Sequence, residues 1–196
     1  MNNHICLASE FEAVIDWQQA IKALARPRIT KPSFTTAGRF VAEGLDQHGN
    51  VIWRDSFKNG TCNGGLDNML SVYLGAGTQI VTWYMGLINN SGFSTLSAAD
   101  TMSSHAGWAE THTTYDEATR PIWNHAAVSG QAITNTTSVS FTINTSITVA
   151  GAFLVSNSTK GGTTGILWAT GQFTTSQSLT NGQTLRITYT CTASAA

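Results

Sequence analysis

The clearest pattern of hydrophobic and polar positions runs from Ser138 to Asn157. In residues 139–143 apolar side chains alternate with serine and threonine, which predicts a strand with one buried face. After a turn at 144–146, residues 147–156 are apolar on both faces, so a central strand covered on both sides is expected. Gly151 inside this strand indicates a bulge or the close approach of another backbone. We expect the other elements to pack on this pair of strands.

Shorter patterns of the same kind predict the remaining strands of a mainly β fold. Residues 38–57 alternate around a turn at 46–50, as in a hairpin. The other expected strands are an interior strand at 78–88 and further strands at 121–128, 131–135, 165–170 and 183–191. This spacing predicts an antiparallel β-sandwich, with a jelly roll as the preferred arrangement and an immunoglobulin-like sandwich as the rival.

Two segments have helical spacing instead. Ser9 and Glu12 are spaced as a capping box, which predicts the start of an N-terminal amphipathic helix. Its apolar stripe consists of Phe11, Val14, Ile15, Ile21 and Leu24. A second, shorter helix is predicted near 65–74, after a loop at 58–65, and its apolar stripe is expected in the core.

Between the first helix and the first strand lies a basic, proline-bearing segment, RPRITKP at 26–32. Because proline fixes φ and removes a backbone donor, this segment is expected to be an extended arm. Its bases are Arg26, Arg28 and Lys31. Together with the apolar stripe, they are the residues that we expect to contact a partner protein or a neighbouring subunit. The alternatives are a solvated connector and a helix that packs back on its own domain. The predicted domains are therefore 1–37, helix and arm, and 38–196, the β-sandwich with its short helix.

Charge is unusually sparse in this chain. Only 11% of the residues are charged, against about 25% in ordinary domains, and the formal net charge is -1. After Glu117 there is no acidic residue. Such a surface suits a subunit packed among copies of itself, which predicts a homotrimer, although a plain threonine-rich β surface has the same composition.

The three cysteines lie far apart and form no C-x-x-C motif, so reduced, structural thiols are expected. The chain opens with no signal-like segment and contains no apolar run of about 18 residues, so we expect synthesis in a cytosol and no membrane partner.

Residues 89–119 lack a clear period but gather most of the candidate chemistry. The acidic and histidine side chains of this region are Asp100, His105, Glu110, His112, Asp116 and Glu117, with His125 just beyond. These ligand types suit Zn or Mn, but the interval from His105 to His112 fits neither a helical nor a strand pair of ligands. We therefore expect no metal, and a surface loop with solvated charges. Its anchors are expected to be Met102, Trp108 and Tyr115.

Catalytic motifs are absent from the sequence. There is no G-x-S-x-G, H-E-x-x-H or P-loop motif. The run from Ser156 to Gly165 carries a lysine among glycines, but its spacing predicts a hairpin turn rather than a phosphate loop. No enzyme, no cofactor and no reading of nucleic-acid sequence are expected. Tryptophans that could instead stack on sugars are Trp53, Trp83, Trp108, Trp123 and Trp168, with burial as the alternative for those in apolar strands.

Four segments carry a resemblance to a family. They are WYMGLI from Trp83, LSAADTMSSHAGWAE from Leu96, YDEATRPIW from Tyr115 and GAFLVSNSTKGGTTGILW from Gly151. Together they resemble small virion proteins of tailed bacteriophages, often encoded near the major capsid protein. The match spans Gly38 to Thr192, and its most specific parts are the D-T-M-x-S-H-A-G-W run and the K-G-G-T-T-G turn.

The resemblance implies a non-enzymatic structural component of the virion on the outer capsid surface. The preferred form is a head decoration, or cement, protein that stabilises the head by bridging capsomers, with the major capsid protein as partner. Residues 1–37 have no counterpart in the family, which leaves a neck, tail or fibre protein with a carbohydrate- or receptor-binding sandwich as the alternative. That alternative requires an exposed aromatic platform around Trp108 or Trp123.

Overall fold

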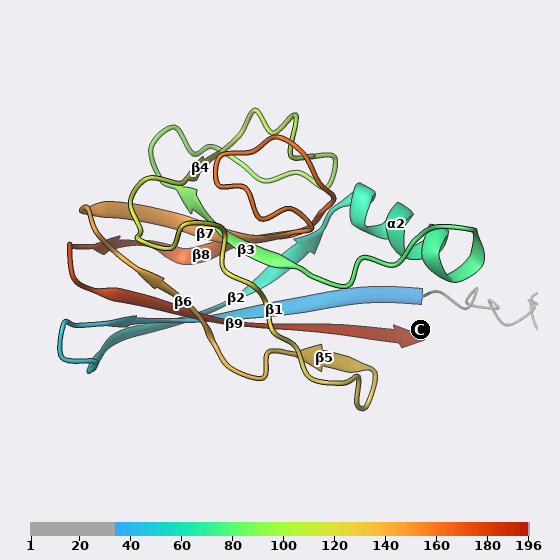
Figure 1. Cartoon of the computed structure of the whole chain (residues 1–196), viewed down its shortest axis with the longest axis horizontal. Coiled ribbons are helices and arrows are strands. Elements are labelled where there is room, and N and C mark those ends of the chain that lie inside the picture. The colour runs from blue at the N-terminus through green and yellow to red at the C-terminus, as the bar shows by residue number, and fades with distance from the viewer. Residues whose placement is uncertain (1–33, 196) are drawn as a thin grey trace, which may run out of the picture. The chain divides into compact units, whose positions relative to one another are not determined.

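The described part of the chain, residues 34–195 of a computed structural model, is an antiparallel sheet of nine strands with one helix (Figure 1). The strands are β1 (Phe34–Leu45), β2 (Val51–Thr61), β3 (Tyr84–Asn89), β4 (Ala109–Thr111), β5 (Ala132–Thr134), β6 (Val139–Thr142), β7 (Ile147–Val155), β8 (Leu167–Leu179) and β9 (Thr184–Ala195), and helix α2 (Asn63–Leu74) follows β2. The predicted mainly β, antiparallel architecture is confirmed. The predicted N-terminal helix and arm, with Cys6, lie outside the described residues.

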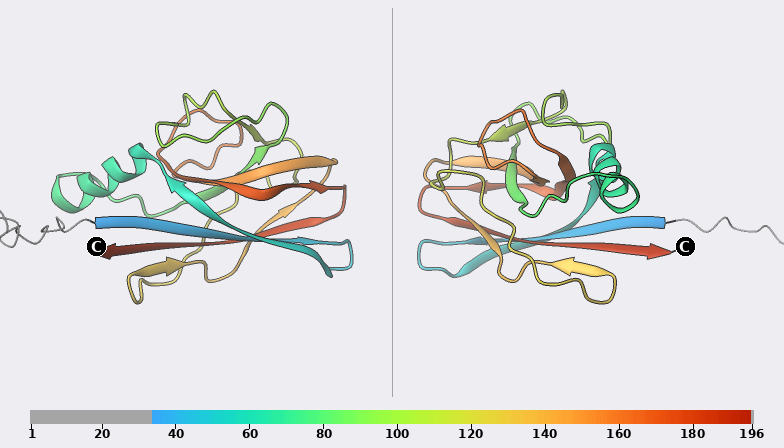
Figure 2. Two further views of the ribbon diagram at one scale, coloured as in Figure 1. Left: turned by 180° about the vertical axis from the view of Figure 1, so that it is seen from behind. Right: turned by 45° about the vertical axis from the view of Figure 1, so that its right-hand side comes forward.

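The strands form two layers that enclose the main core (Figure 2). Their order is β4-β3-β7-β8-β2-β1-β9-β5, with β6 also beside β9. Strand β2 passes from one layer to the other, because residues 51–58 pair with β1 whereas residues 59–61 pair with β8. Rings from both layers meet between them, for example Phe57 of β2 and Phe173 of β8, whose centroids are 4.8 Å apart.

The two strands predicted from the sequence 138–157 are present, and their burial is as expected. In β6 the apolar side chains are buried and the polar ones exposed, while β7 is buried on both faces from Val149 to Val155. The register of β7 shifts next to Gly151, where an added Cβ would collide with the backbone oxygen of Gly171. The two strands do not pair with each other, however. β6 pairs with β9, and β7 lies between β3 and β8, so the turn at 144–146 connects the two layers.

The hairpin predicted at 38–57 is confirmed as β1 and β2, and β1 already begins at Phe34, where it pairs with the end of β9. The Asp46 carboxylate closes the turn by accepting hydrogen bonds from the backbone N–H groups of His48 and Asn50, each at 2.8 Å, and from the Asn50 side-chain amide at 2.9 Å. These bonds, the Asn50 side chain first among them, lower the pKa of Asp46 below its usual value.

Three local predictions are wrong. The expected loop at 58–65 is mostly regular structure, because residues 59–61 extend β2 along β8 and α2 begins at Asn63. The strand expected at 78–88 starts only at Tyr84. The segment from Pro121 is not a strand but makes isolated bridges, such as Ile122 with Tyr84. In the two mispredicted strands apolar composition failed for burial as well as for backbone pairing, since Val81, Ile122 and Val128 are exposed.

The apolar stripe of α2 is also not in the core. The helix ends at Leu74, as predicted, but Leu70, Tyr73 and Leu74 are 51%, 82% and 85% exposed. Only the start of the helix packs tightly on the sheet, where an added Cβ at Gly65 would lie 2.9 Å from the Trp168 ring. Within residues 34–195, no helix has the length and apolar character needed to cross a membrane.

Candidate functional site: a loop clasp and an apolar groove

Long loops cover the outer face of the β3, β7 and β8 layer. They bury a second apolar cluster that consists of Cys62, Ile88, Met102, Trp108, Ala150, Phe153, Val155 and Leu167. Met102 and Trp108 thus anchor the loop as predicted, and Tyr115 is buried against Phe141 of the main core, with ring centroids 5.1 Å apart. This cover explains why β7 is apolar on both faces.

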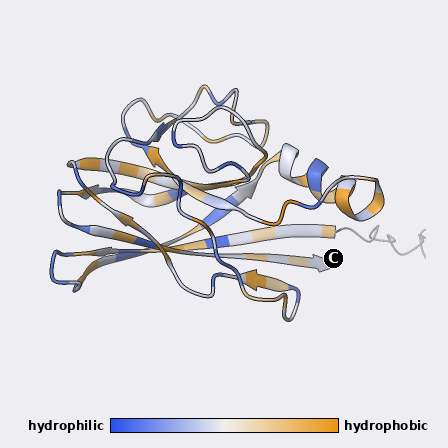
Figure 3. Cartoon of the chain, in the orientation of Figure 1, coloured by the Kyte–Doolittle hydropathy of each residue, from blue (hydrophilic) through white to orange (hydrophobic). Residues whose placement is uncertain are grey.

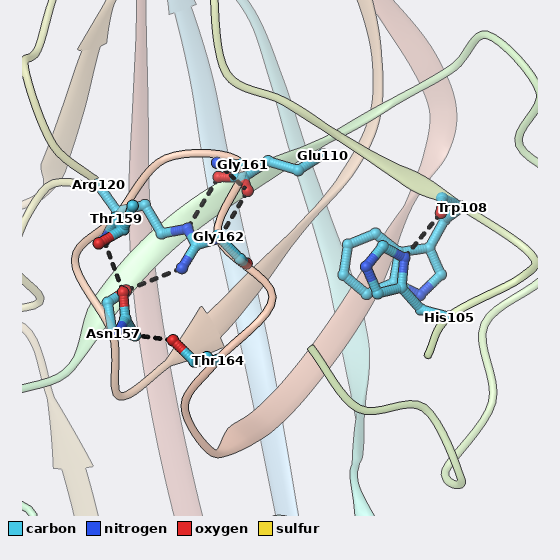
Figure 4. Close-up of polar contacts among 9 residues, drawn as sticks. All are labelled: His105, Trp108, Glu110, Arg120, Asn157, Thr159, Gly161, Gly162 and Thr164. Atoms are coloured by element: carbon cyan, nitrogen blue, oxygen red, sulfur yellow. Dashed lines mark hydrogen bonds and ion pairs between the residues drawn. The ribbon is translucent and has the colours of Figure 1, made fainter. Parts of the chain in front are cut away.

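The loops are held by one buried ion pair (Figure 4). Arg120 and Glu110 form two bonds, Nε to Oε1 at 2.8 Å and Nη2 to Oε2 at 2.6 Å, and their side chains are 0% and 5% exposed. The prediction that the charges of this loop are solvated is therefore wrong for Glu110. A buried charge is tolerated because the bidentate geometry compensates for lost hydration.

The same two side chains also fix the 156–166 loop, which joins β7 to β8 as the predicted hairpin connection. Arg120 donates to the backbone oxygens of Asn157 at 2.9 Å and Gly162 at 3.0 Å. Glu110 accepts a hydrogen bond from the backbone N–H of Gly161 at 2.8 Å, where φ is 68°. We call Glu110, Arg120, Lys160 and the 156–166 loop the loop clasp.

Lys160, which lies among glycines as the lysine of a phosphate loop does, also points into the protein. Its Nζ donates to the backbone oxygens of Tyr115 at 2.9 Å and Glu117 at 2.8 Å, and lies 3.9 Å from the centroid of the Tyr115 ring. Burial, reinforced by the negative charge of Glu110, raises the pKa of the Tyr115 phenol. The ammonium group thus holds backbone of this chain and is not directed outward to a phosphate.

The histidines and carboxylates considered as metal ligands serve separate local roles. His105 stacks on Trp108, with centroids 3.9 Å apart, and donates from Nδ1 to the Trp108 oxygen at 2.8 Å. His125 lies beside Trp123. The Glu117 carboxylate accepts the backbone N–H of Thr142. Among the described residues, no group of three or more histidine, cysteine, aspartate and glutamate side chains is placed to hold a metal ion.

The tryptophans weighed for sugar stacking are not arranged as a platform. Trp108 and Trp123 are each only 4% exposed. The Trp108 indole donates to Asp100 Oδ2 at 2.9 Å, and that of Trp123 donates to Asn135 Oδ1 at 2.6 Å. Both indoles therefore have internal partners, and the feature required for a receptor-binding platform at these positions is missing.

One face of the described part of the chain carries an apolar groove with a volume of about 1010 Å³. Its floor includes Trp83, Trp168 and Tyr189, and its rim includes the exposed end of α2 and Val128. Figure 3 shows the apolar colouring of that helix end. We call this feature the apolar groove. The sequence does not predict this groove, because the spacing of the α2 stripe is that of a core helix.

Of the two described cysteines, one lies beneath the loops and the other lines the apolar groove. Cys62 is buried beneath the loops, and burial raises the pKa of its thiol to about 11. Cys191 is half-buried, lines the groove, and also has a pKa raised by burial. Neither forms a disulfide, in agreement with the prediction of reduced thiols.

One sequence signal could have identified the clasp. After Glu117 only three basic residues remain in the chain, and two of them, Arg120 and Lys160, are the cations of the clasp. A base that is buried in a segment without acidic residues needs a distant partner. The residues predicted for partner binding, from Phe11 to Lys31, lie outside the described part, so their placement stays a prediction. No protein-family model matches the chain, and no match was found among curated proteins.

Proposed function

We propose that this protein is a structural component of a tailed-bacteriophage virion, and that it decorates the outer capsid surface and bridges capsomers as a cement protein. The proposal rests on the resemblance of four sequence segments to small phage virion proteins. The role is non-enzymatic and needs no cofactor, and the main partner is the major capsid protein.

The observation that carries the proposal is the way in which these four segments come together. Residues 84–88 of the first segment lie in β3, which pairs with β7 in the segment 151–168. The segments 96–110 and 115–123 contribute Glu110 and Arg120, which hold the loop in 151–168. A resemblance carried by one connected unit of structure supports a common fold better than matches scattered over the chain would.

The sparse charge of the described surface supports a role in assembly, because interfaces between subunits are depleted of charged residues at their centres. We extend the proposal to a homotrimer, in which a closed ring would cover such a surface. A jelly-roll relation between the two layers and a helix within residues 1–37 belong to the proposal as well. The stripe and bases of that segment would provide attachment to the capsid or to a neighbouring subunit.

The rival proposal, a tail, neck or fibre protein with a sugar-binding platform, has less support. Its required feature was exposed indole surface at Trp108 or Trp123, and both side chains are buried. The burial of both indoles supports a role on the head over the rival proposal.

Localisation in purified particles tests this proposal. Antibody labelling and cryo-electron microscopy of the virion whose genome encodes the chain should show it on the outer capsid face, at sites that join capsomers. Particles in which the gene is disrupted should release DNA at a lower temperature. Absence of the protein from purified particles, or its presence only on the tail, would overturn the proposal.

A further inference from the structure

The apolar groove has the composition of a binding surface. Large contiguous apolar patches on a protein surface usually mark an interaction site. Of the residues that line it, none is aspartate, glutamate, lysine or arginine. Its rim carries Tyr73, Leu74 and Val128, each more than two thirds exposed. A partner would therefore be recognised by apolar shape and not by charge.

The floor of the groove disfavours a polar ligand. A small-molecule site usually combines apolar walls with a few free polar groups that fix orientation, in a volume of about 300–1,000 Å³. Here the Trp168 indole already donates to the Tyr189 hydroxyl at 3.1 Å, and the Trp123 indole to Asn135. With these donors occupied and a volume at the upper limit of that range, an amphipathic peptide segment fits better than a sugar.

We propose that the groove binds the apolar stripe of residues 11–24 supplied by a second copy of this chain. Binding would follow the helix-in-groove mode, in which side chains at helical spacing enter an apolar channel. The stripe consists of Phe11, Val14, Ile15, Ile21 and Leu24. The chain outside the described part, residues 1–33, ends where β1 begins at Phe34, and Phe34 itself lines the groove. The arm of each copy thus starts at the surface that is to be occupied.

The connector between the stripe and Phe34 has the length that exchange with a neighbouring copy requires. Residues 25–33 separate the stripe from Phe34, and they include Pro27 and Pro32. Proline disfavours helical conformation in the residue before it, so the sequence predicts an extended connector. Nine extended residues span roughly 30 Å, which is long enough for the stripe to reach the groove of an adjacent copy. Repetition of this exchange around a ring closes the assembly.

This inference deepens the attachment role proposed above and rests on it for residues 11–24. Its test uses the purified full-length protein, so a failure leaves the result of localisation in the virion unaffected. Conversely, absence from virions would leave the test of self-association intact.

Sedimentation equilibrium of four full-length variants tests the groove and the stripe together. Leu74→Glu on the groove rim and Ile15→Glu on the stripe should each weaken self-association at least about tenfold, and the double variant should be no weaker than either single one. Ile52→Glu is the matched control, since Ile52 is an exposed apolar residue, 48% accessible, that does not line the groove. A monomeric wild-type protein, or self-association that survives Leu74→Glu, would overturn the proposal.

A photo-crosslinker at position 15 distinguishes the two sources of the stripe. A mixture of isotopically light and heavy full-length protein should give crosslinks between light and heavy chains, in peptides from α2 or from residues 123–133. Crosslinks confined to one chain would show that the stripe packs on its own domain. Crosslinks elsewhere in the partner would show that the groove is not the receptor. Either result would refute the inference.

Discussion

The loop clasp and the apolar groove differ in whether their side chains find partners within the described chain. In the clasp, the buried charges of Arg120 and Glu110 meet each other and three backbone groups of the same chain. In the groove, apolar side chains at the end of α2 stay exposed. The clasp is therefore complete within one chain, and the groove has the character of a surface that is completed by association. Stability should depend on the first and assembly on the second.

The largest effect should follow the loss of one partner of the clasp. Glu110→Ala leaves the Arg120 guanidinium buried without its counter-charge, and breaking a buried pair in this way costs about 3–5 kcal/mol. Urea unfolding at pH 7 should show this loss in the free energy of unfolding, together with increased hydrogen exchange in the 156–166 loop.

Glu43→Ala is the matched control for that experiment. Glu43 pairs with Arg54 at 2.7 Å, but the two side chains are 29% and 68% exposed, so the loss should be about 0–1 kcal/mol. If the two variants were equally stable, the clasp would be no more than a surface ion pair, and its contrast with the groove would disappear.

A smaller effect is expected from adding a side chain at Gly151, where β7 closely approaches the backbone of β8. Gly151→Ala places a methyl group against the oxygen of Gly171, a backbone atom of β8 that cannot move without disturbing the pairing with β7. Overpacking of this kind costs about 1–3 kcal/mol. Gly60→Ala is the control, because Gly60 also lies in a strand and an added Cβ there meets no atom within 4 Å. Thermal unfolding that ranks the two variants equally would contradict the close approach.

The sequence predicted the parts of this fold that depend on local periodicity. The alternation of β6, the two buried faces of β7 and the hairpin of β1 and β2 were all expected, because strand period and turn residues are encoded in neighbouring positions. The pairing partners of the strands were not predicted. Nothing in the run from Val139 to Val155 shows that its two strands belong to different layers, since pairing depends on distant edges.

The candidate sites were predicted less well, for two physical reasons. Arg120 meets Glu110 and Gly162 only after folding. The scarcity of bases after Glu117 marks Arg120 and Lys160 as unusual, but charge spacing along the chain does not show which groups they meet. The stripe of α2 has the spacing of a core helix, and an interface within a domain cannot be told from an interface between molecules by periodicity alone. Both errors therefore fall on the features most relevant to function.

The smallest effect is a difference in reactivity between two cysteines. Cys62 lies beneath the loops, and Cys191 lines the apolar groove. Thiolate is the reactive form of cysteine, and burial raises the pKa of Cys62 from 9.0 to about 11. Because this pKa is raised, its contribution to stability is complete below pH 9 and is lost as the pH rises through about 11. At pH 8, alkylation of Cys62 by iodoacetamide should be about a hundredfold slower in the folded protein than in urea.

Cys191 provides the internal reference, since it is half-buried and lines the groove. Peptide mass spectrometry after timed alkylation should find Cys191 modified before Cys62 in the same molecules, and Leu74→Glu, which weakens association at the groove, should accelerate only Cys191. Equal rates at the two thiols would mean that the loops open as readily as the groove. In that case the clasp would not keep the loops closed over Cys62, and the contrast between the clasp and the apolar groove would be wrong.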